Sequence, residues 1–183
     1  MKDRLSLLLC GALCACAHAP RPFGRPDRLS ADDHFRLGSA YEEQGLEDDA
    51  ARQYKKSLRL DSGDPEVWVA SGNAKFKRGD VSHAEDDYLH ALGLTGDHAD
   101  AQNHLALAYL AQNKKLKEAE RLAKTALREN ATLRPYVLDT LARIYAREGR
   151  CAESFATAAQ AEEEAKYSGL PFPPPEYLWT VSQ

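Results

Sequence analysis

The sequence predicts an all-α protein in which four pairs of helices stack into a right-handed solenoid. Only two of the nine prolines, Pro65 and Pro135, lie in the middle of the chain, so long helices can form there. Small residues recur at a constant interval, because Gly38, Gly72 and Ala106 lie 34 residues apart. One helix pair cannot bury its own apolar stripe, and units of this length therefore stack on one another.

Each unit is expected to be a helix, a tight turn and a second helix. The turn between the two helices should contain a left-handed residue that ends the first helix, and four residues fit this role: Gly45, Gly79, Asn113 and Gly149. Asp64 and Pro65 are typical of an N-cap and the first helical position. The last interval, from Ala106 to Ala142, is 36 residues, which predicts an insertion of two residues around 112–117.

The same spacing governs the larger side chains. In the second unit, Trp68 and Gly72 are followed on the next helix by Ala84 and Tyr88. The other units have Gly38, Tyr41, Ala50 and Tyr54, then Ala106, Tyr109, Ala119 and Ala123, then Ala142, Tyr145, Ser154 and Ala158, and the second unit has Lys75 where they have the first tyrosine. This pattern resembles the tetratricopeptide repeat over residues 30–167. The resemblance implies a scaffold that binds extended peptides or helices on its concave face and has no catalytic residues.

The N-terminal residues resemble the leader of a bacterial lipoprotein. Lys2 and Arg4 precede a short apolar run that is too short to span a bilayer. The run ends in Leu-Cys-Ala-Cys, which is similar to a lipobox, and this resemblance makes Cys16 the lipidated residue. Two other interpretations remain open for these cysteines: a metal or redox cluster, and an ordinary secretory cut after Ala17.

The predicted organisation has four parts: a signal peptide over residues 1–15, a Pro-rich tether over 16–29, the repeat domain over 30–167, and a tail over 168–183. In lipoproteins an aspartate after the anchor retains the protein at the inner membrane. Ala17 stands there instead, so the resemblance implies an outer-membrane lipoprotein that faces the periplasm. The resemblance to lipoproteins that contain such repeats further implies a role in assembling a multiprotein complex of the cell envelope. The tail is expected either to cover the apolar end of the stack or to be an exposed ligand for another protein.

The first helix of each unit should line the concave face. The residues expected to meet a protein partner there are Phe35, Ser39, Asn73, Phe76, Asn103, Leu107, Tyr136 and Arg143, and the same stripe includes Lys77, Leu110 and Arg147. We expect the amides of Asn73 and Asn103 to be exposed on one continuous surface. Without a ligand, these residues would only solvate the groove or hold the tail. The formal net charge is -4, whereas nucleic-acid-binding proteins are usually basic, so the sequence does not predict nucleic-acid binding.

Few residues offer chemistry of their own. His83 and His90 lie on one face of a helix, a spacing that could hold a metal ion. Two alternatives to a membrane-anchored scaffold therefore remain. One is a metal-binding accessory protein of an enzyme that uses this face, and the other is a soluble secreted repeat protein. No catalytic residues, cofactor or small-molecule substrate are predicted. Cys151 is expected to be a small buried residue at the start of a helix.

Overall fold

The computed structural model describes residues 29–169, and this part of the chain is almost entirely helical. Its elements are α1 (Ala31–Glu43), α2 (Glu47–Leu60), α3 (Pro65–Lys77), α4 (Val81–Thr95), α5 (Ala99–Ala111), α6 (Leu116–Glu129), the 3-10 turn η1 (Ala131–Leu133), α7 (Arg134–Arg147) and α8 (Cys151–Ser168). The described residues therefore form the four helix pairs that the sequence predicts. The signal peptide, the tether up to residue 28 and nearly all of the tail lie outside the described residues.

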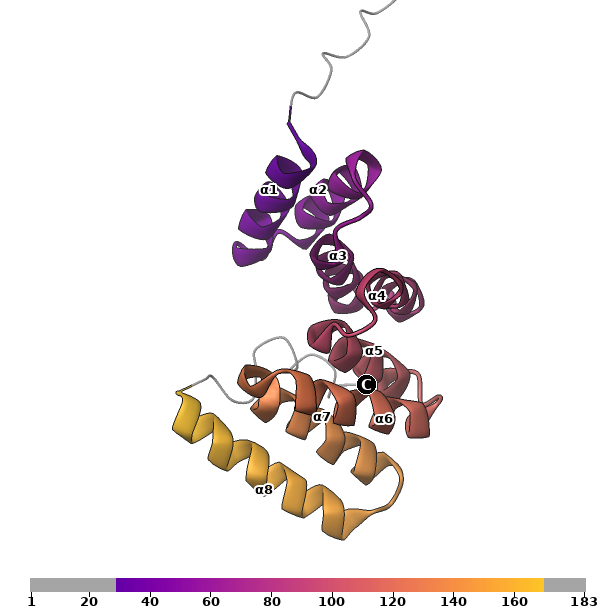
Figure 1. Ribbon diagram of the computed structural model, residues 1–183, viewed down its shortest axis with the longest axis vertical. Helices are drawn as coiled ribbons and strands as arrows, with labels where there is room; N and C mark the ends of the chain where they lie inside the picture. The colour runs from indigo at the N-terminus through magenta and orange to yellow at the C-terminus, as the bar shows by residue number, and fades with distance from the viewer. Residues whose placement is uncertain (1–28, 170–183) are drawn as a thin grey trace, which may run out of the picture.

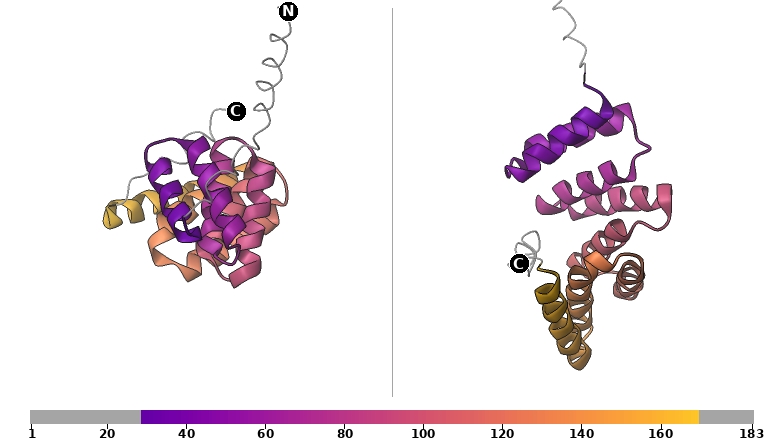
Figure 2. Two further views of the ribbon diagram at one scale, coloured as in Figure 1. Left: turned by 90° about the horizontal axis from the view of Figure 1, so that it is seen from above. Right: turned by 60° about the vertical axis from the view of Figure 1, so that its left-hand side comes forward.

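The helix pairs succeed one another along the stack (Figure 1). Each helix packs mainly on its own partner and on the next helix in the chain. The first helices of the pairs also meet one another, α1 with α3, α3 with α5 and α5 with α7, so the odd-numbered helices form the inner layer. Figure 2 shows the successive pairs turning relative to one another, as expected of a solenoid.

The turns inside the pairs have the predicted left-handed residues. Gly45, Gly79 and Gly149 have φ angles of 72°, 80° and 74°, and Asn113 takes the same role at 49°. The predicted cap of α3 is also present, because the Asp64 side chain accepts a hydrogen bond of 2.9 Å from the backbone N–H of Glu66. These caps satisfy backbone groups that would otherwise be left unpaired at the helix ends.

The insertion in the third unit is divided between two places. One extra residue lengthens the turn between α5 and α6, where Lys115 has a φ of 50°. The second lengthens the start of α7, which has 14 residues where α1, α3 and α5 each have 13. The prediction that both residues fall around 112–117 was therefore half wrong. One extra residue lies in a turn and the other in the first turn of a helix.

The core of the first two units is built from a tyrosine opposite a glycine. Tyr54 and Tyr88 are fully buried, and they face Gly38 and Gly72. A Cβ added to Gly72 would lie 2.5 Å from Cε1 of Tyr88, and one added to Gly38 would lie 2.5 Å from Cε1 of Tyr54. These glycines are therefore required for close approach. In the third unit Ala106 and Ala123 are both fully buried at the corresponding positions.

Ion pairs join successive units along one edge of the stack. In each pair an acid of the second helix meets a base in the turn of the following unit: Asp48 with Arg78 at 3.3 Å, Glu85 with Lys114 at 2.7 Å and Glu120 with Arg150 at 2.9 Å. We call these three contacts the edge ladder. Because each base lies beside the left-handed residue of its turn, the ladder connects each of these turns to the second helix of the preceding unit.

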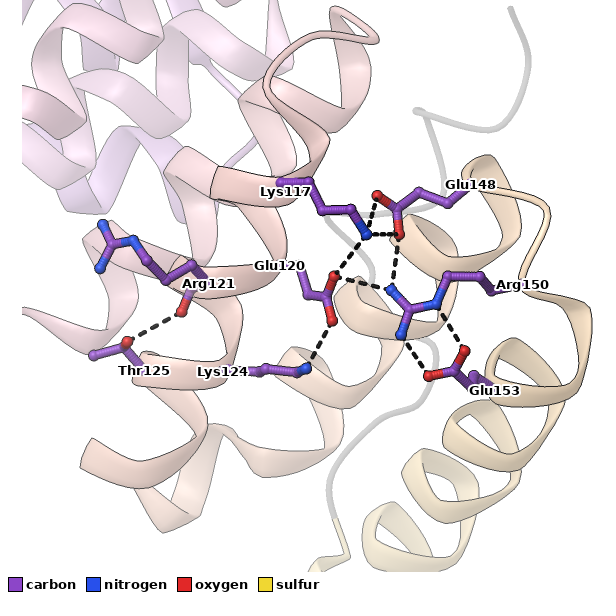
Figure 3. Close-up of polar contacts among 8 residues, drawn as sticks. All are labelled: Lys117, Glu120, Arg121, Lys124, Thr125, Glu148, Arg150 and Glu153. Carbon is purple, nitrogen blue, oxygen red and sulfur yellow. Dashed lines mark hydrogen bonds and ion pairs between the residues drawn. The ribbon is translucent and has the colours of Figure 1, made fainter.

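The last step of the edge ladder is the most connected (Figure 3). The guanidinium of Arg150 contacts Glu120 at 2.9 Å, Glu148 at 2.8 Å and also Glu153. Lys124 contacts the other oxygen of Glu120 at 2.7 Å. Burial alone would raise the pKa of Glu120, but hydrogen bonds from Lys124 and Arg150 outweigh it and lower that pKa to about 2. The network therefore holds a carboxylate that stays charged at neutral pH.

Candidate functional site

The inner layer contains a hollow where α3, α5 and α7 come together. Its volume is about 430 Å³, and its lining residues are Phe76, Lys77, Arg78, Gly79, Val81, Leu107, Leu110, Ala111, Arg143 and Arg147. We call this the inner hollow. Four of the lining residues are basic and none is acidic. The remainder are apolar side chains or glycine, so a positively charged rim surrounds an apolar floor.

The floor forms because the inner helices pack directly on one another. Phe76 and Leu110 are each 5% exposed and Leu107 is 3% exposed, and all three belong to the largest core cluster of the described residues. The floor is thus rigid core surface rather than a set of mobile side chains. A rigid apolar floor reduces the conformational entropy lost when a ligand binds.

Ion pairs with the first unit hold one side of the rim in place. Lys77 contacts Glu42 at 2.5 Å, and Glu42 also accepts a hydrogen bond of 2.7 Å from the hydroxyl of Tyr54. Arg78 meets Asp48 at 3.3 Å through the edge ladder. These contacts fix the positions of the two cations while leaving part of each side chain exposed.

The other side of the rim comes from α7. Arg143 lies 3.7 Å from Asp139, one helical turn earlier. Burial raises the pKa of Asp139, and Arg143 offsets this only in part. Arg147 is exposed in the last turn of α7. The two arginines are four residues apart and therefore project from the same face of the helix.

Three of the predicted groove residues meet in the inner hollow, namely Phe76, Leu107 and Arg143. Phe35 and Ser39 lie on α1, away from the hollow lining. The ring of Phe35 packs 5.9 Å from that of Tyr54, and the hydroxyl of Ser39 donates to the carbonyl of Phe35. Tyr136 is half-buried in the first turns of α7. The predicted set is therefore spread over the inner layer rather than gathered at one point.

The expectation that the two amides are exposed was wrong. Asn103 is only 4% exposed. Asn73 is half-buried, and its side-chain oxygen accepts a hydrogen bond of 2.9 Å from the hydroxyl of Tyr88. For Asn73 the reason is its contact with the second helix of its own pair, which contains Tyr88. Replacing both amides with alanine would disturb the core and would not test the surface alone.

Four lining residues were not in the predicted set: Arg78, Gly79, Val81 and Ala111. Arg78 and Gly79 lie in the turn between α3 and α4, Val81 begins α4, and Ala111 ends α5. The left-handed Gly79 was visible in the sequence. That its turn faces α7 depends on how the units rotate, which the repeat pattern does not give.

A second hollow of about 590 Å³ lies between α2 and α3, and its lining includes Lys55, Arg59 and Trp68. Unlike the inner hollow, this one also has acidic residues in its lining, Asp48 and Asp80. Its charges are therefore partly balanced within the lining itself. It offers a useful reference for experiments on the inner hollow.

The residues considered for chemistry are dispersed. His83 is exposed and contacts Asp80 at 2.7 Å, whereas the ring of His90 stacks on Trp68 with centroids 4.5 Å apart. Between residues 29 and 169, no group of three or more His, Cys, Asp or Glu side chains is placed to hold a metal ion. Cys151 begins α8 as predicted, but it is exposed, so the expectation that it is buried was wrong. The helix start leaves its side chain outside the α7–α8 interface.

The arrangement of the helices defines a class of protein, the helical-repeat solenoids. Residues 34–64, which cover most of α1 and α2, match the family model described as Tetratricopeptide repeat. The other three helix pairs repeat this geometry, so the described residues have the predicted fold, a right-handed solenoid of four helix pairs of the tetratricopeptide kind.

Solved structures show the same fold. A crystal structure of MamA is 22% identical to the chain with a TM-score of 0.67, and the match covers 78% of this chain and 82% of that one. A second crystal structure of MamA is 23% identical with a TM-score of 0.64, and covers 79% of each chain. At these identities the likeness concerns the fold alone. No curated protein sequence matches the chain.

Proposed function

We propose that the protein is a non-catalytic scaffold, anchored to a membrane through Cys16, that binds a protein partner in the inner hollow. The observation that carries the proposal is the lining of this hollow, where four cations surround an apolar floor and the acids that pair with three of them, Glu42, Asp48 and Asp139, lie outside the lining. A volume of about 430 Å³ falls within the range of specific ligand sites. The tetratricopeptide fold supports a protein as the ligand.

The lining also indicates the chemistry of the partner. Arginine binds carboxylates through two parallel hydrogen bonds, and Arg143 and Arg147 offer this on one face of α7. The floor of Phe76, Leu107 and Leu110 suits an aliphatic or aromatic side chain. The matching ligand is an extended peptide segment in which an acidic residue lies next to apolar ones.

The anchor and the location extend the proposal to the cell envelope. Cys16 lies outside the described residues, and its lipidation is proposed from the lipobox resemblance in Leu-Cys-Ala-Cys. Within residues 29–169, no helix is long and apolar enough to cross a membrane. A lipid anchor at the outer membrane would hold the solenoid on the periplasmic side, where it would help to assemble an envelope machine.

Crosslinking in intact cells tests the inner hollow directly. A photoreactive amino acid at position 111 in the inner hollow should crosslink the partner, whereas the same group at position 59 in the second hollow should not. Arg143→Gln with Arg147→Gln should lower capture by a crosslinker at position 111 about tenfold, since losing the two charged contacts is expected to cost about 1.4 kcal/mol.

The matched control is Lys55→Gln with Arg59→Gln. This pair has the same four-residue spacing on an exposed face and loses the same charge. Equal capture by the inner-hollow variant and the control would contradict the proposed site.

The lipid anchor is tested by Cys16→Ala. This variant should lose metabolic labelling with fatty acid and should release the protein from the membrane fraction, because the thiol that carries the lipid is gone. Cys14→Ala should keep both the label and the membrane fraction. Labelling that persists in Cys16→Ala would show that another residue carries the lipid.

A further inference from the structure

We infer that the C-terminal segment of this chain, residues 170–183, binds in the inner hollow and blocks it until a partner displaces it. The inference deepens the proposed function, on which its regulatory part rests, because it names a competitor for the same site. The segment lies outside the described residues, and its sequence is Leu-Pro-Phe-Pro-Pro-Pro-Glu-Tyr-Leu-Trp-Thr-Val-Ser-Gln.

The composition of the segment complements the lining of the hollow. Its one charged residue is Glu176, and it has no lysine or arginine. Three large apolar side chains follow the acid directly, Tyr177, Leu178 and Trp179. This is the ligand that the hollow requires, a carboxylate for the rim of cations followed by apolar groups for the floor. Three consecutive prolines before the acid favour an extended backbone, which loses little entropy on binding.

The segment begins close to α7, the helix that contributes Arg143 and Arg147 to the rim. Arg134, the first residue of α7, binds Glu164 near the end of α8 through two contacts of 2.8 Å. The end of α8 therefore lies beside the start of α7. Gly169 caps α8 with a φ of 66°, a left-handed conformation that lets the chain reverse direction. A chain that reverses here runs back along α7 toward its arginines.

The length of the segment matches this path. Gly169 lies about 8 Å beyond Glu164 along α8, and Arg143 lies about 14 Å from the start of α7, which gives a path of about 22 Å. Seven residues of polyproline conformation, the number from Gly169 to Glu176, span about 22 Å. Glu176 can therefore reach Arg143, and the three apolar residues after it continue toward Arg147 and the floor.

The outer face of α8 is the other apolar surface at this end of the stack, since Phe155 is 79% exposed and Tyr167 is 86% exposed. That face has two exposed acids, Glu162 and Glu163, and one exposed base, Lys166, so its charge is slightly negative. It would therefore attract Glu176 less than the rim of the inner hollow, which has four cations. Charge therefore favours the hollow over the end of the stack.

Fluorescence of Trp179 tests the inference in the full chain. The protein has two tryptophans, so Trp68→Phe leaves Trp179 as the only one. In this parent chain Trp179 should resist quenching by acrylamide several-fold better than the same residue in a synthetic peptide of residues 170–183. Either Glu176→Arg or Arg143→Gln with Arg147→Gln should remove this protection. The control pair Lys55→Gln with Arg59→Gln should keep it.

Two outcomes would overturn the inference. Trp179 could be as easily quenched in the parent chain as in the peptide, which would mean that the segment does not dock. Alternatively, Trp179 could stay protected in the variants of Arg143, Arg147 and Glu176, which would place the segment on another surface. Circular dichroism of each variant checks that the helices are retained, so loss of protection is not mistaken for unfolding.

Partner capture separates this inference from the proposed function. With a crosslinker at position 111, Glu176→Arg should increase capture several-fold, because it empties the hollow without altering its lining. A Trp179 that is unprotected while capture persists would overturn the inference and leave the proposed function standing. A protected Trp179 with no capture in either chain would instead contradict the proposed function and leave the docking of the segment intact.

Discussion

Replacing Tyr88 with alanine should lower the free energy of unfolding by about 3 kcal/mol or more, in the range for aromatic residues removed from a core. Tyr88 is fully buried, its ring stacks on His104 with centroids 5.6 Å apart, and its hydroxyl donates to Asn73. Tyr88→Phe should cost only about 1 kcal/mol, because it removes the hydrogen bond and keeps the ring. Chemical denaturation followed by circular dichroism measures both values.

The glycine opposite this ring makes the test sharper. Gly72→Ala should destabilise the protein by about 1–3 kcal/mol, since its Cβ would lie 2.5 Å from a buried ring that cannot move away. In the Tyr88→Ala background the sign should reverse, because alanine is favoured over glycine in a helix by about 1 kcal/mol once the clash is gone.

Gly93→Ala, in α4, is the matched control, since a Cβ there meets nothing within 4 Å. It should stabilise both backgrounds equally. Additive effects of Gly72→Ala and Tyr88→Ala would show that the two residues do not pack as the structure has them.

The sequence was sufficient to predict features that recur from unit to unit. The small residue at Gly72 and the left-handed Asn113 both follow from the repeat, because each depends on neighbours within one helix pair. The predicted surface was less accurate. Asn103 is buried and Asn73 is half-buried, where the repeat pattern predicted two exposed amides.

Contacts between units could not be predicted from the sequence. Glu120 meets Arg150 across 30 residues, and the inner hollow brings Arg78 near Arg147 across a much larger separation. Such contacts depend on the rotation from one unit to the next. Small differences in loops, such as the 3-10 turn Ala131–Leu133, alter that rotation without changing the repeat pattern. The spacing of the apolar residues therefore predicts the helices, but it does not predict which turns lie close to which helices of other units.

Glu120 should make the protein sensitive to acid in a defined pH range. Its pKa is lowered from 4.5 to about 2 in the folded state, although burial opposes the shift, because Lys124 and Arg150 stabilise the charged form. A depressed folded-state pKa contributes stability that is present above pH 4.5 and is lost as the pH falls toward 2. The side chain is only 12% exposed, so the shift corresponds to about 3 kcal/mol.

Glu120→Gln isolates this contribution, since glutamine has the same shape and cannot ionise. The wild type should be more stable than Glu120→Gln by about 3 kcal/mol at pH 7, and the difference should shrink toward zero near pH 2, where Glu120 is itself protonated. The other acids of the network, Glu148 and Glu153, titrate in both proteins; the charge of Glu120 opposes the lowering of their pKa, so the measured difference includes this smaller repulsion. Glu163→Gln, on the exposed face of α8, should leave the curve unchanged. A difference of the same size at pH 7 and at pH 3 would mean that the edge ladder does not depend on the charge of Glu120.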